Sequence, residues 1–179
     1  MEEGETMNAG AIDAKTVCDE IVAAFRDVPR PDRCAPEDFV AYDEAEDLDY
    51  LIGKTWIDIA ADVTYMTRHH EDQFSYMTRE CLFYLFPGYL LGAVNHEPDL
   101  CKGVLNSLLG ILNPHERSEW AKELFQYFSE RLTPIQKKAV AHWIKLQLER
   151  DKERNPELYD AEVRQTRYQL AFAKWQQWA

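Results

Sequence analysis

The chain has 179 residues, of which 46% are hydrophobic and 12% aromatic, and its formal net charge is −12. This length suits a single domain, and the apolar content excludes a chain that is disordered throughout. The acidity argues against nucleic acid and against anionic membrane surfaces as direct ligands, because both carry negative charge.

Negative charge is concentrated in the N-terminal part of the chain. Residues 1–72 hold 19 acids and 6 bases, whereas residues 73–179 hold 13 acids and 14 bases. We expect a disordered tail over residues 1–10 and one helical domain over residues 11–179. Within this domain, an acidic part (11–72) precedes an apolar helical core (73–179).

Residues that can cap or end a helix predict the first helices of the chain. Asp13 can cap a helix, whose apolar stripe comprises Val17, Ile21, Ala24 and Phe25. A second, acidic helix is predicted over residues 36–52, with Gly53 as its C-terminal stop. Residues 55–66 are rich in β-branched and aromatic side chains, so either a short extended segment or a short helical connector is expected there.

The following residues predict a series of helices. Thr78 can cap a central helix that is apolar on nearly all sides and that Pro87 would kink or split. Apolar residues then recur at every fourth position from Leu100 to Leu112. The next helix has a wide apolar face that comprises Trp120, Ala121, Leu124, Phe125, Tyr127 and Phe128.

Thr133, Pro134 and Gln136 form the clearest local signal, namely an N-cap, a first-turn proline and the partner residue of a capping box. The core face of that helix is predicted to comprise Ile135, Ala139, Val140, Trp143 and Leu146. A last helix is predicted to start at Asn155-Pro156, with a core side of Tyr159, Val163, Thr166, Leu170 and Ala173. The pattern as a whole predicts an all-α fold, a single compact bundle of six to eight helices.

Two segments resemble a group of small uncharacterised bacterial proteins. Residues 77–91 (MTRECLFYLFPGYLL) are similar to the group's L-T-x-E-x-x-x-Y-x-L-P-x-Y-L-L segment. Residues 128–141 (FSERLTPIQKKAVA) are similar to its F-x-x-L-T-P-x-Q-x-x-A-V segment. Similar proteins recur among bacterial partner and immunity-type proteins, so the resemblance implies a binding protein. The group has no established catalytic residues, so the resemblance assigns none to this chain.

An acidic tract is the candidate binding site. Residues 37–49 contain seven acids and no base, with aromatic side chains interleaved as at protein interfaces. We expect a basic protein partner, a cognate toxin such as a nuclease, which long-range attraction would help to capture. The alternative is a charged face that only aids solubility. The predicted contact residues are Glu37, Asp38, Tyr42, Asp43, Glu46, Asp47, Asp49 and Tyr50.

The evidence for a catalytic or metal-binding site is weaker. His69, His70, Glu71 and Asp72 can each bind metal, but adjacent helical residues do not face one ion, so we expect a solvated loop; a pH sensor or a weak metal site is the alternative. The remaining histidines, which are isolated in sequence, are His96, His115 and His142. No phosphate-binding or nucleophile motif occurs. We therefore expect neither catalytic residues nor a metal or cofactor.

The cysteines and the N-terminus bear on the compartment. No C-x-x-C pair exists, so reduced and mostly buried thiols are expected at Cys18, Cys34, Cys81 and Cys101. The chain begins without the features of a signal peptide, and its longest uncharged run is shorter than the roughly 20 residues of a membrane span. We therefore expect a cytoplasmic protein. We also expect a monomer or a weak homodimer.

Two other functions remain open from the sequence. One is an enzyme whose cleft is built from histidine and carboxylate side chains. The other is an adaptor that self-associates through aromatic surface such as Trp175 and Trp178.

Overall fold

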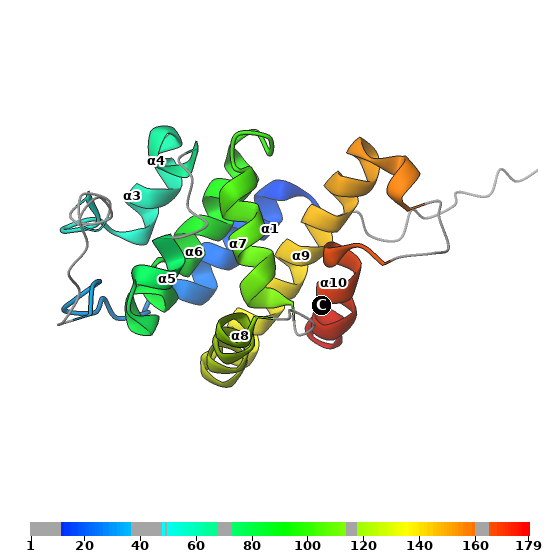
Figure 1. The fold of residues 1–179 in the computed structure, drawn as a ribbon. Helices are drawn as coiled ribbons and strands as arrows, with labels where there is room; N and C mark the ends of the chain where they lie inside the picture. The colour runs from blue at the N-terminus through cyan, green and yellow to red at the C-terminus, as the bar shows by residue number, and fades with distance from the viewer. Residues whose placement is uncertain (1–11, 37–47, 49, 68–72, 114–117, 160–164) are drawn as a thin grey trace, which may run out of the picture.

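Helices are the regular elements of this chain in the computed structural model, which describes residues 12–36, 48, 50–67, 73–113, 118–159 and 165–179 (Figure 1). No strand occurs in these residues, so the predicted all-α class is confirmed. The longer helices are α1 (Ala14–Phe25), α6 (Arg79–Asn95), α7 (Lys102–Leu112), α8 (Glu119–Arg131), α9 (Pro134–Arg154) and α10 (Arg167–Trp175). Three short helices precede α6, namely α3 (Trp56–Ala61), α4 (Val63–Thr67) and α5 (Gln73–Tyr76). The tail predicted over residues 1–10 lies outside the described residues.

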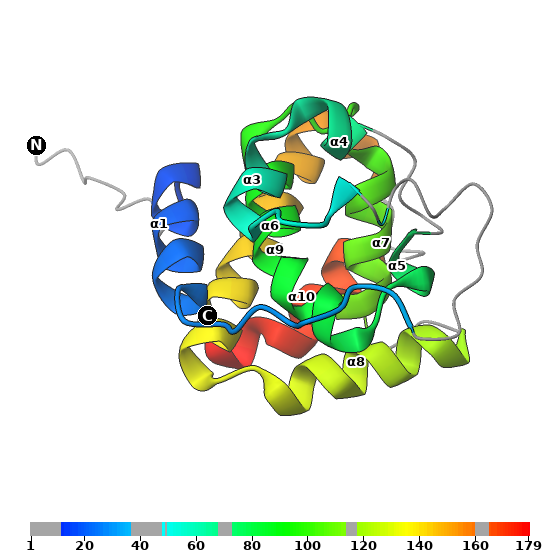
Figure 2. The same ribbon diagram turned by 90° about the vertical axis from the view of Figure 1, so that its left-hand side faces the viewer.

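The centre of the bundle is α6, as its apolar sequence predicts. Every residue from Cys81 to Val94 is buried except Phe83. The helix continues through Pro87, so the predicted split does not occur. Proline removes one backbone donor, and burial on nearly all sides holds the helix together. The helices α1, α3, α4 and α7 pack on α6, and Figure 2 shows α8 lying crosswise along one end of the bundle.

The C-terminal turn of α6 is held by side chains of α9. The last carbonyl groups of a helix lack partners within it. Here α9 supplies partners for two of them and also bonds a carbonyl slightly earlier in α6, because three of its residues lie on one stripe that faces α6. The hydrogen bonds run from Trp143 Nε1 to the Leu90 carbonyl (2.9 Å), from Gln147 Nε2 to the Ala93 carbonyl (3.3 Å) and from Arg150 Nη1 to the Val94 carbonyl (3.1 Å).

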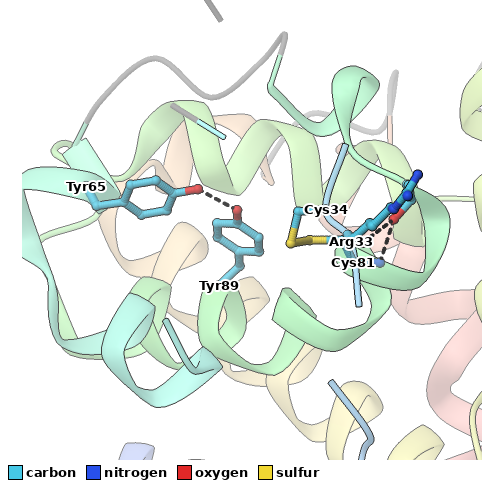
Figure 3. Close-up of a disulfide and its surroundings, with 6 residues drawn as sticks. Arg33, Cys34, Tyr65, Cys81 and Tyr89 are labelled. Atoms are coloured by element: carbon cyan, nitrogen blue, oxygen red, sulfur yellow. Dashed lines mark hydrogen bonds between the residues drawn. A yellow bond between two sulfur atoms is a disulfide. The ribbon is translucent and has the colours of Figure 1, made fainter. Parts of the chain in front are cut away.

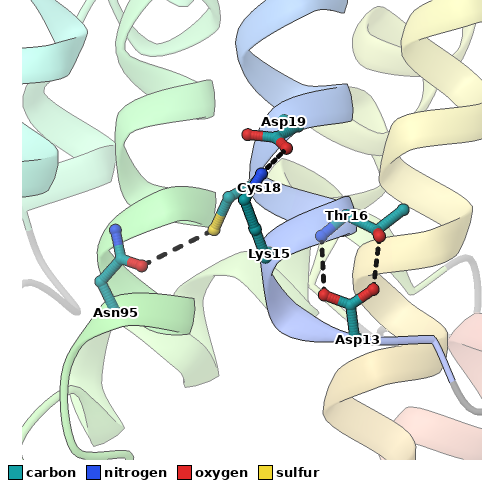
Figure 4. A network of polar contacts seen from close by, with 6 residues as sticks. All are labelled: Asp13, Lys15, Thr16, Cys18, Asp19 and Asn95. Carbon is teal, nitrogen blue, oxygen red and sulfur yellow. Dashed lines mark hydrogen bonds and ion pairs between the residues drawn. The ribbon is translucent and has the colours of Figure 1, made fainter.

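Three predicted helix starts are confirmed. The Asp13 carboxylate accepts a hydrogen bond from the backbone N–H three residues on, at 3.0 Å (Figure 4). The Thr78 hydroxyl accepts the equivalent bond at the start of α6, at 3.1 Å. Thr133 and Gln136 form both bonds of the predicted capping box, at 3.3 and 3.0 Å. Local side-chain chemistry therefore sets where these helices begin.

Residues 55–66 are helical, so the alternative of an extended segment is wrong. A capping box between Thr55 and Asp58 starts α3, and the apolar side of that short helix packs on α6. Gly53 has a φ of +82°, a left-handed conformation that suits its predicted role as a stop. Most of the acidic helix predicted over residues 36–52 lies outside the described residues.

The last helix begins later than predicted. Asn155-Pro156 opens only a 3₁₀ turn, Pro156–Leu158, and α10 follows Thr166. Thr166, which was expected in the core, is the N-cap and accepts a hydrogen bond from the Gln169 N–H at 3.2 Å. This later start changes the buried face, so Ala173 is exposed. Val163 lies outside the described residues.

Some residues predicted to face the core are exposed instead. They lie in the first turn of a helix or just before it, where the buried stripe of the helix has not yet begun. These residues are Leu100, Trp120 and Ile135.

A disulfide joins Cys34 to Cys81, with their Cα atoms 4.8 Å apart (Figure 3). The expectation of four reduced thiols is therefore wrong for this pair, whereas Cys18 and Cys101 are free. The two bonded cysteines are 47 positions apart. Only the packing of the segment after α1 against the start of α6 brings them together, so their spacing gives no sign of the bond.

Candidate functional site

Tyr50 is the one predicted contact residue that the described part of the chain includes. Glu37, Asp38, Tyr42, Asp43, Glu46, Asp47 and Asp49 lie outside it. The structure therefore shows how the C-terminal end of the acidic tract is attached to the fold. It leaves the predicted contacts of the tract itself untested.

Tyr50 is an anchor within the fold. Its ring stacks on that of Tyr65, with centroids 4.9 Å apart and an interplanar angle of 15°. Its hydroxyl donates a hydrogen bond to Asp62, and Lys54 Nζ lies 4.8 Å from its ring centroid. The neighbouring Leu51 is buried. These contacts fix the point where the acidic tract joins α3.

Further aromatic residues connect this anchor to the centre of α6. The hydroxyl groups of Tyr65 and Tyr89 lie 2.8 Å apart in the buried interior, and Phe74 packs on Tyr89 with ring centroids 4.6 Å apart. Figure 3 shows the two tyrosines beside the Cys34–Cys81 disulfide. The acidic tract thus lies, in sequence, between two points that are both attached to α6.

Two aspartates extend the negative charge beyond the tract. Hydrogen bonds from the backbone and side chain of Thr55 lower the pKa of Asp58. The Tyr50 hydroxyl, followed by the Tyr65 backbone N–H, lowers the pKa of Asp62. Both carboxylates therefore stay ionised over the whole neutral range. Asp58 accepts from the Thr55 N–H at 2.7 Å and Asp62 accepts from the Tyr65 N–H at 2.9 Å, so both carboxylates are held at the starts of short helices.

Exposed apolar side chains accompany these acids. Ile52 is 73% exposed, Ile57 56% and Val63 47%. Ile57 lies away from the side of α3 that packs on α6 through Trp56 and Ala60. Sequence reasoning missed these residues as interface candidates. The sequence feature that could have indicated them is Ile57, an isoleucine that lies off the apolar stripe of the short capped helix α3.

A cleft of about 520 Å³ lies between the end of α6 and the last turns of α9. Its polar lining includes His96, Glu97, Arg150 and Glu153, and Val63 forms part of its wall. His96 is the C-cap of α6, and its Nε2 lies 2.9 Å from the Ala60 carbonyl oxygen. That contact holds the imidazole against the end of α3.

The other histidines lie away from this cleft or outside the described residues. His142 Nδ1 lies 2.5 Å from a carboxylate oxygen of Glu20 and links α9 to α1. His115 and the cluster of His69, His70, Glu71 and Asp72 lie outside the described residues. Elsewhere, in the ranges that the structure describes, no group of three His, Cys, Asp or Glu side chains gathers closely enough to hold a metal ion.

No family model, curated protein or solved structure matches this chain. The resemblance to the bacterial immunity-type group, and what it implies, therefore stays a prediction. Among the described residues, no helix combines the length and the apolar character that crossing a membrane requires.

Proposed function

We propose that this chain is an immunity-type binding protein that captures a basic protein, such as a nuclease toxin, and neutralises it by covering its active surface. One observation carries the proposal. Residues 1–72 have a net charge of −13, and the same part of the chain presents the exposed side chains of Ile52, Ile57 and Val63. Exposed apolar side chains in a part of the chain that carries charge of one sign suit a partner of the opposite sign.

In this proposal, the acids and the exposed apolar residues act on different steps of binding. The acids attract a basic partner over a distance of about 8–10 Å at physiological salt and raise the rate of encounter. The isoleucines then supply the apolar area that slows dissociation. The proposal therefore separates two effects, with acids acting on association and apolar residues acting on dissociation.

Self-association through the C-terminal tryptophans has less support. Trp175 is buried, and its Nε1 donates to the Leu112 carbonyl at 2.9 Å. Trp178 packs on Trp175 with ring centroids 5.4 Å apart, and Lys137 Nζ lies 5.1 Å from its ring centroid. Both rings therefore serve the fold. This removes Trp175 from the surface that the adaptor alternative requires.

A small-molecule site in the His96 cleft is a second candidate. Its volume of about 520 Å³ falls within the range of ligand pockets, and histidine and carboxylate groups converge on it. The two candidates make different demands on His96. His96→Gln should leave capture of a basic protein unchanged, whereas it should weaken binding of a ligand in the cleft.

The proposed function is tested on the purified product of the gene next to that of this chain. We expect a complex by calorimetry and restored growth of a host that expresses both proteins. Ile57→Ala should speed dissociation by about threefold to tenfold. Ile135→Ala, at the start of α9, is the matched control, because Ile135 is also highly exposed (70%) and lies outside the acidic part.

Equal effects of the two substitutions would contradict the proposed surface. A complex that forms without restoring growth would contradict neutralisation.

A further inference from the structure

The Cys34–Cys81 disulfide joins parts of the chain that no helix connects. Cys34 lies in the irregular segment after α1, and Cys81 lies in the first turn of α6. Thr78, the N-cap of α6, adds to the junction. Its N–H donates to the Cys34 carbonyl at 2.8 Å, and its hydroxyl donates to the Arg33 carbonyl at 3.2 Å. Figure 3 shows this junction, with Tyr65 and Tyr89 beside it.

The two sulfur atoms differ in their access to solvent. Cys34 is half-buried, whereas Cys81 is fully buried. In thiol–disulfide exchange a thiolate attacks one sulfur and the other departs as a thiolate. We therefore expect an external thiol to attack Sγ of Cys34, the more exposed residue, with Cys81 as the leaving group. The departing sulfur lies at the positive end of the α6 dipole, which favours negative charge.

A second anchor lies beyond the acidic tract. Leu48 and Leu51 are buried, and Tyr50 stacks on Tyr65. In sequence, the acids of residues 37–49 therefore lie between this anchor and the disulfide. A chain segment fixed at both ends has less conformational freedom than one fixed at a single end.

We propose that the Cys34–Cys81 disulfide is a switch that low-molecular-weight thiols reduce, and that it sets how firmly residues 33–36 are held to the start of α6. One thiolate attacks Sγ of Cys34 and forms a mixed disulfide as the Cys34–Cys81 bond breaks. Cys81 leaves as a thiolate and takes a proton from water. A second small thiol releases Cys34 as a thiol. Two small thiols are thereby oxidised to their disulfide, and the protein gains two electrons and two protons.

Reduction removes the covalent link between residues 33–36, which precede the acidic tract in sequence, and the start of α6. Side-chain packing and the two hydrogen bonds of Thr78 still hold residues 33–36, whereas the covalent link is gone. More freedom is then lost when a partner binds, so binding weakens. This consequence for partner binding rests on the proposed function, whereas the loosening itself does not.

Hydrogen–deuterium exchange of the full chain, with and without dithiothreitol, tests the switch. A thiol count should rise from the two free cysteines to four, which shows that reduction is complete. We expect the amides of Thr78 and Cys81 to exchange about tenfold faster or more after reduction. The amides of residues 139–148 in α9 should keep their rates. Unchanged exchange at Thr78 and Cys81 in the reduced protein would overturn the proposal.

Two variants make the assignment specific. Cys34→Ser should show fast exchange at Thr78 without reductant and no further response to it. Cys18→Ser is the matched control, because Cys18 is also half-buried and its Sγ contacts Asn95 at 3.6 Å (Figure 4). This variant keeps the disulfide and should respond to dithiothreitol as the parent does. A lost response in Cys18→Ser would contradict the assignment.

The consequence for binding is measured on the same gene-neighbour protein. Reductant should weaken the complex with the parent chain by about fivefold and leave the Cys34→Ser complex unaffected. A parent complex that is indifferent to reductant would contradict this part of the inference. Absence of a complex in both states would overturn the proposed function, while the exchange measurement would still decide the switch.

Discussion

Gly88 of α6 lies so close to the backbone of Trp56 that a Cβ atom at this position would be 2.3 Å from the Trp56 carbonyl oxygen. The absence of a side chain therefore allows α3 to lie directly on α6. One turn later, a Cβ atom on Gly92 would meet the end of the Met66 side chain, also at 2.3 Å. The two glycines seat α3 and α4, which carry the exposed Ile57 and Val63.

Alanine at these two glycines should have unequal effects. Gly88→Ala forces backbone against backbone and should lower the free energy of unfolding by about 1–3 kcal/mol. Gly92→Ala meets a flexible thioether that can move, and helix propensity returns up to about 1 kcal/mol. Its loss should therefore be smaller. Urea unfolding of both variants measures the difference, and equal losses would contradict the close approach of α3.

The capping box at the start of α9 gives a second prediction. Thr133→Ala should cost about 0.5–2 kcal/mol of unfolding free energy, because the Gln136 N–H loses its acceptor. Thr133→Ser keeps a hydroxyl at this position and should restore most of the loss. Thermal or urea unfolding provides the measurement, and an unchanged midpoint for the alanine variant would mean that the cap carries no stability.

Much of the fold could be predicted because helix starts are local. Asp13, Thr78 and Thr133 each sit within three residues of the amide that they cap, so the sequence alone exposes the bond. The central position of α6 followed from apolar residues on all its sides. By contrast, Thr166 fits a core position of the apolar pattern as well as an N-cap position. Which of these positions it takes depends on where the last helix begins.

Long-range contacts could not be predicted. The pairing of Cys34 with Cys81 depends on how the segment after α1 packs, and their spacing in the sequence does not predict it. The exposure of Ile57 depends on which side of α3 meets Gly88. Tyr50 was predicted as a contact residue, which stays a prediction, and the sequence indicated neither its stacking on Tyr65 nor its bond to Asp62.

The ionisation of Asp62 yields a prediction about pH. Its pKa is lowered in the folded state from an ordinary value of 3.8, first by the Tyr50 hydroxyl and then by the Tyr65 N–H. The stability from this carboxylate is therefore complete above its ordinary pKa and is lost as the pH falls through the lower, folded value. Asp62→Asn should be less stable than the parent by roughly 0.5–1.5 kcal/mol at neutral pH. The difference should shrink as the pH falls below the ordinary pKa of 3.8.

Urea unfolding between about pH 2 and pH 7 measures this difference. A gap that stays constant over the whole range would show that the charge of Asp62 is not what stabilises the fold.

The bond between Tyr50 and Asp62 can be separated from the stacking. Tyr50→Phe keeps the ring on Tyr65 but removes the hydroxyl, so it should lose part of what Asp62→Asn loses, because Asp62 also accepts from the Tyr65 N–H. The double variant should then lose less than the sum of the two single losses, because both remove the bond between Tyr50 and Asp62. Chemical unfolding of the three variants provides this cycle, and fully additive losses would exclude the interaction.

The central claim is that the acidic tract draws in a basic partner. Asp43→Asn, Glu46→Gln and Asp47→Asn, combined in one chain, should slow association with the gene-neighbour protein severalfold at low salt and flatten the salt dependence of the rate. A matched triple variant, Glu130→Gln, Glu153→Gln and Glu157→Gln, makes the same change in net charge at exposed positions of the C-terminal part.

Stopped-flow association rates at low and high salt, measured for the parent and both triple variants, test this claim most directly. The account predicts that the tract variant binds more slowly at low salt, that the control variant stays close to the parent, and that all three converge at high salt. Unchanged association of the tract variant at low salt, or equal slowing in both triple variants, would contradict it.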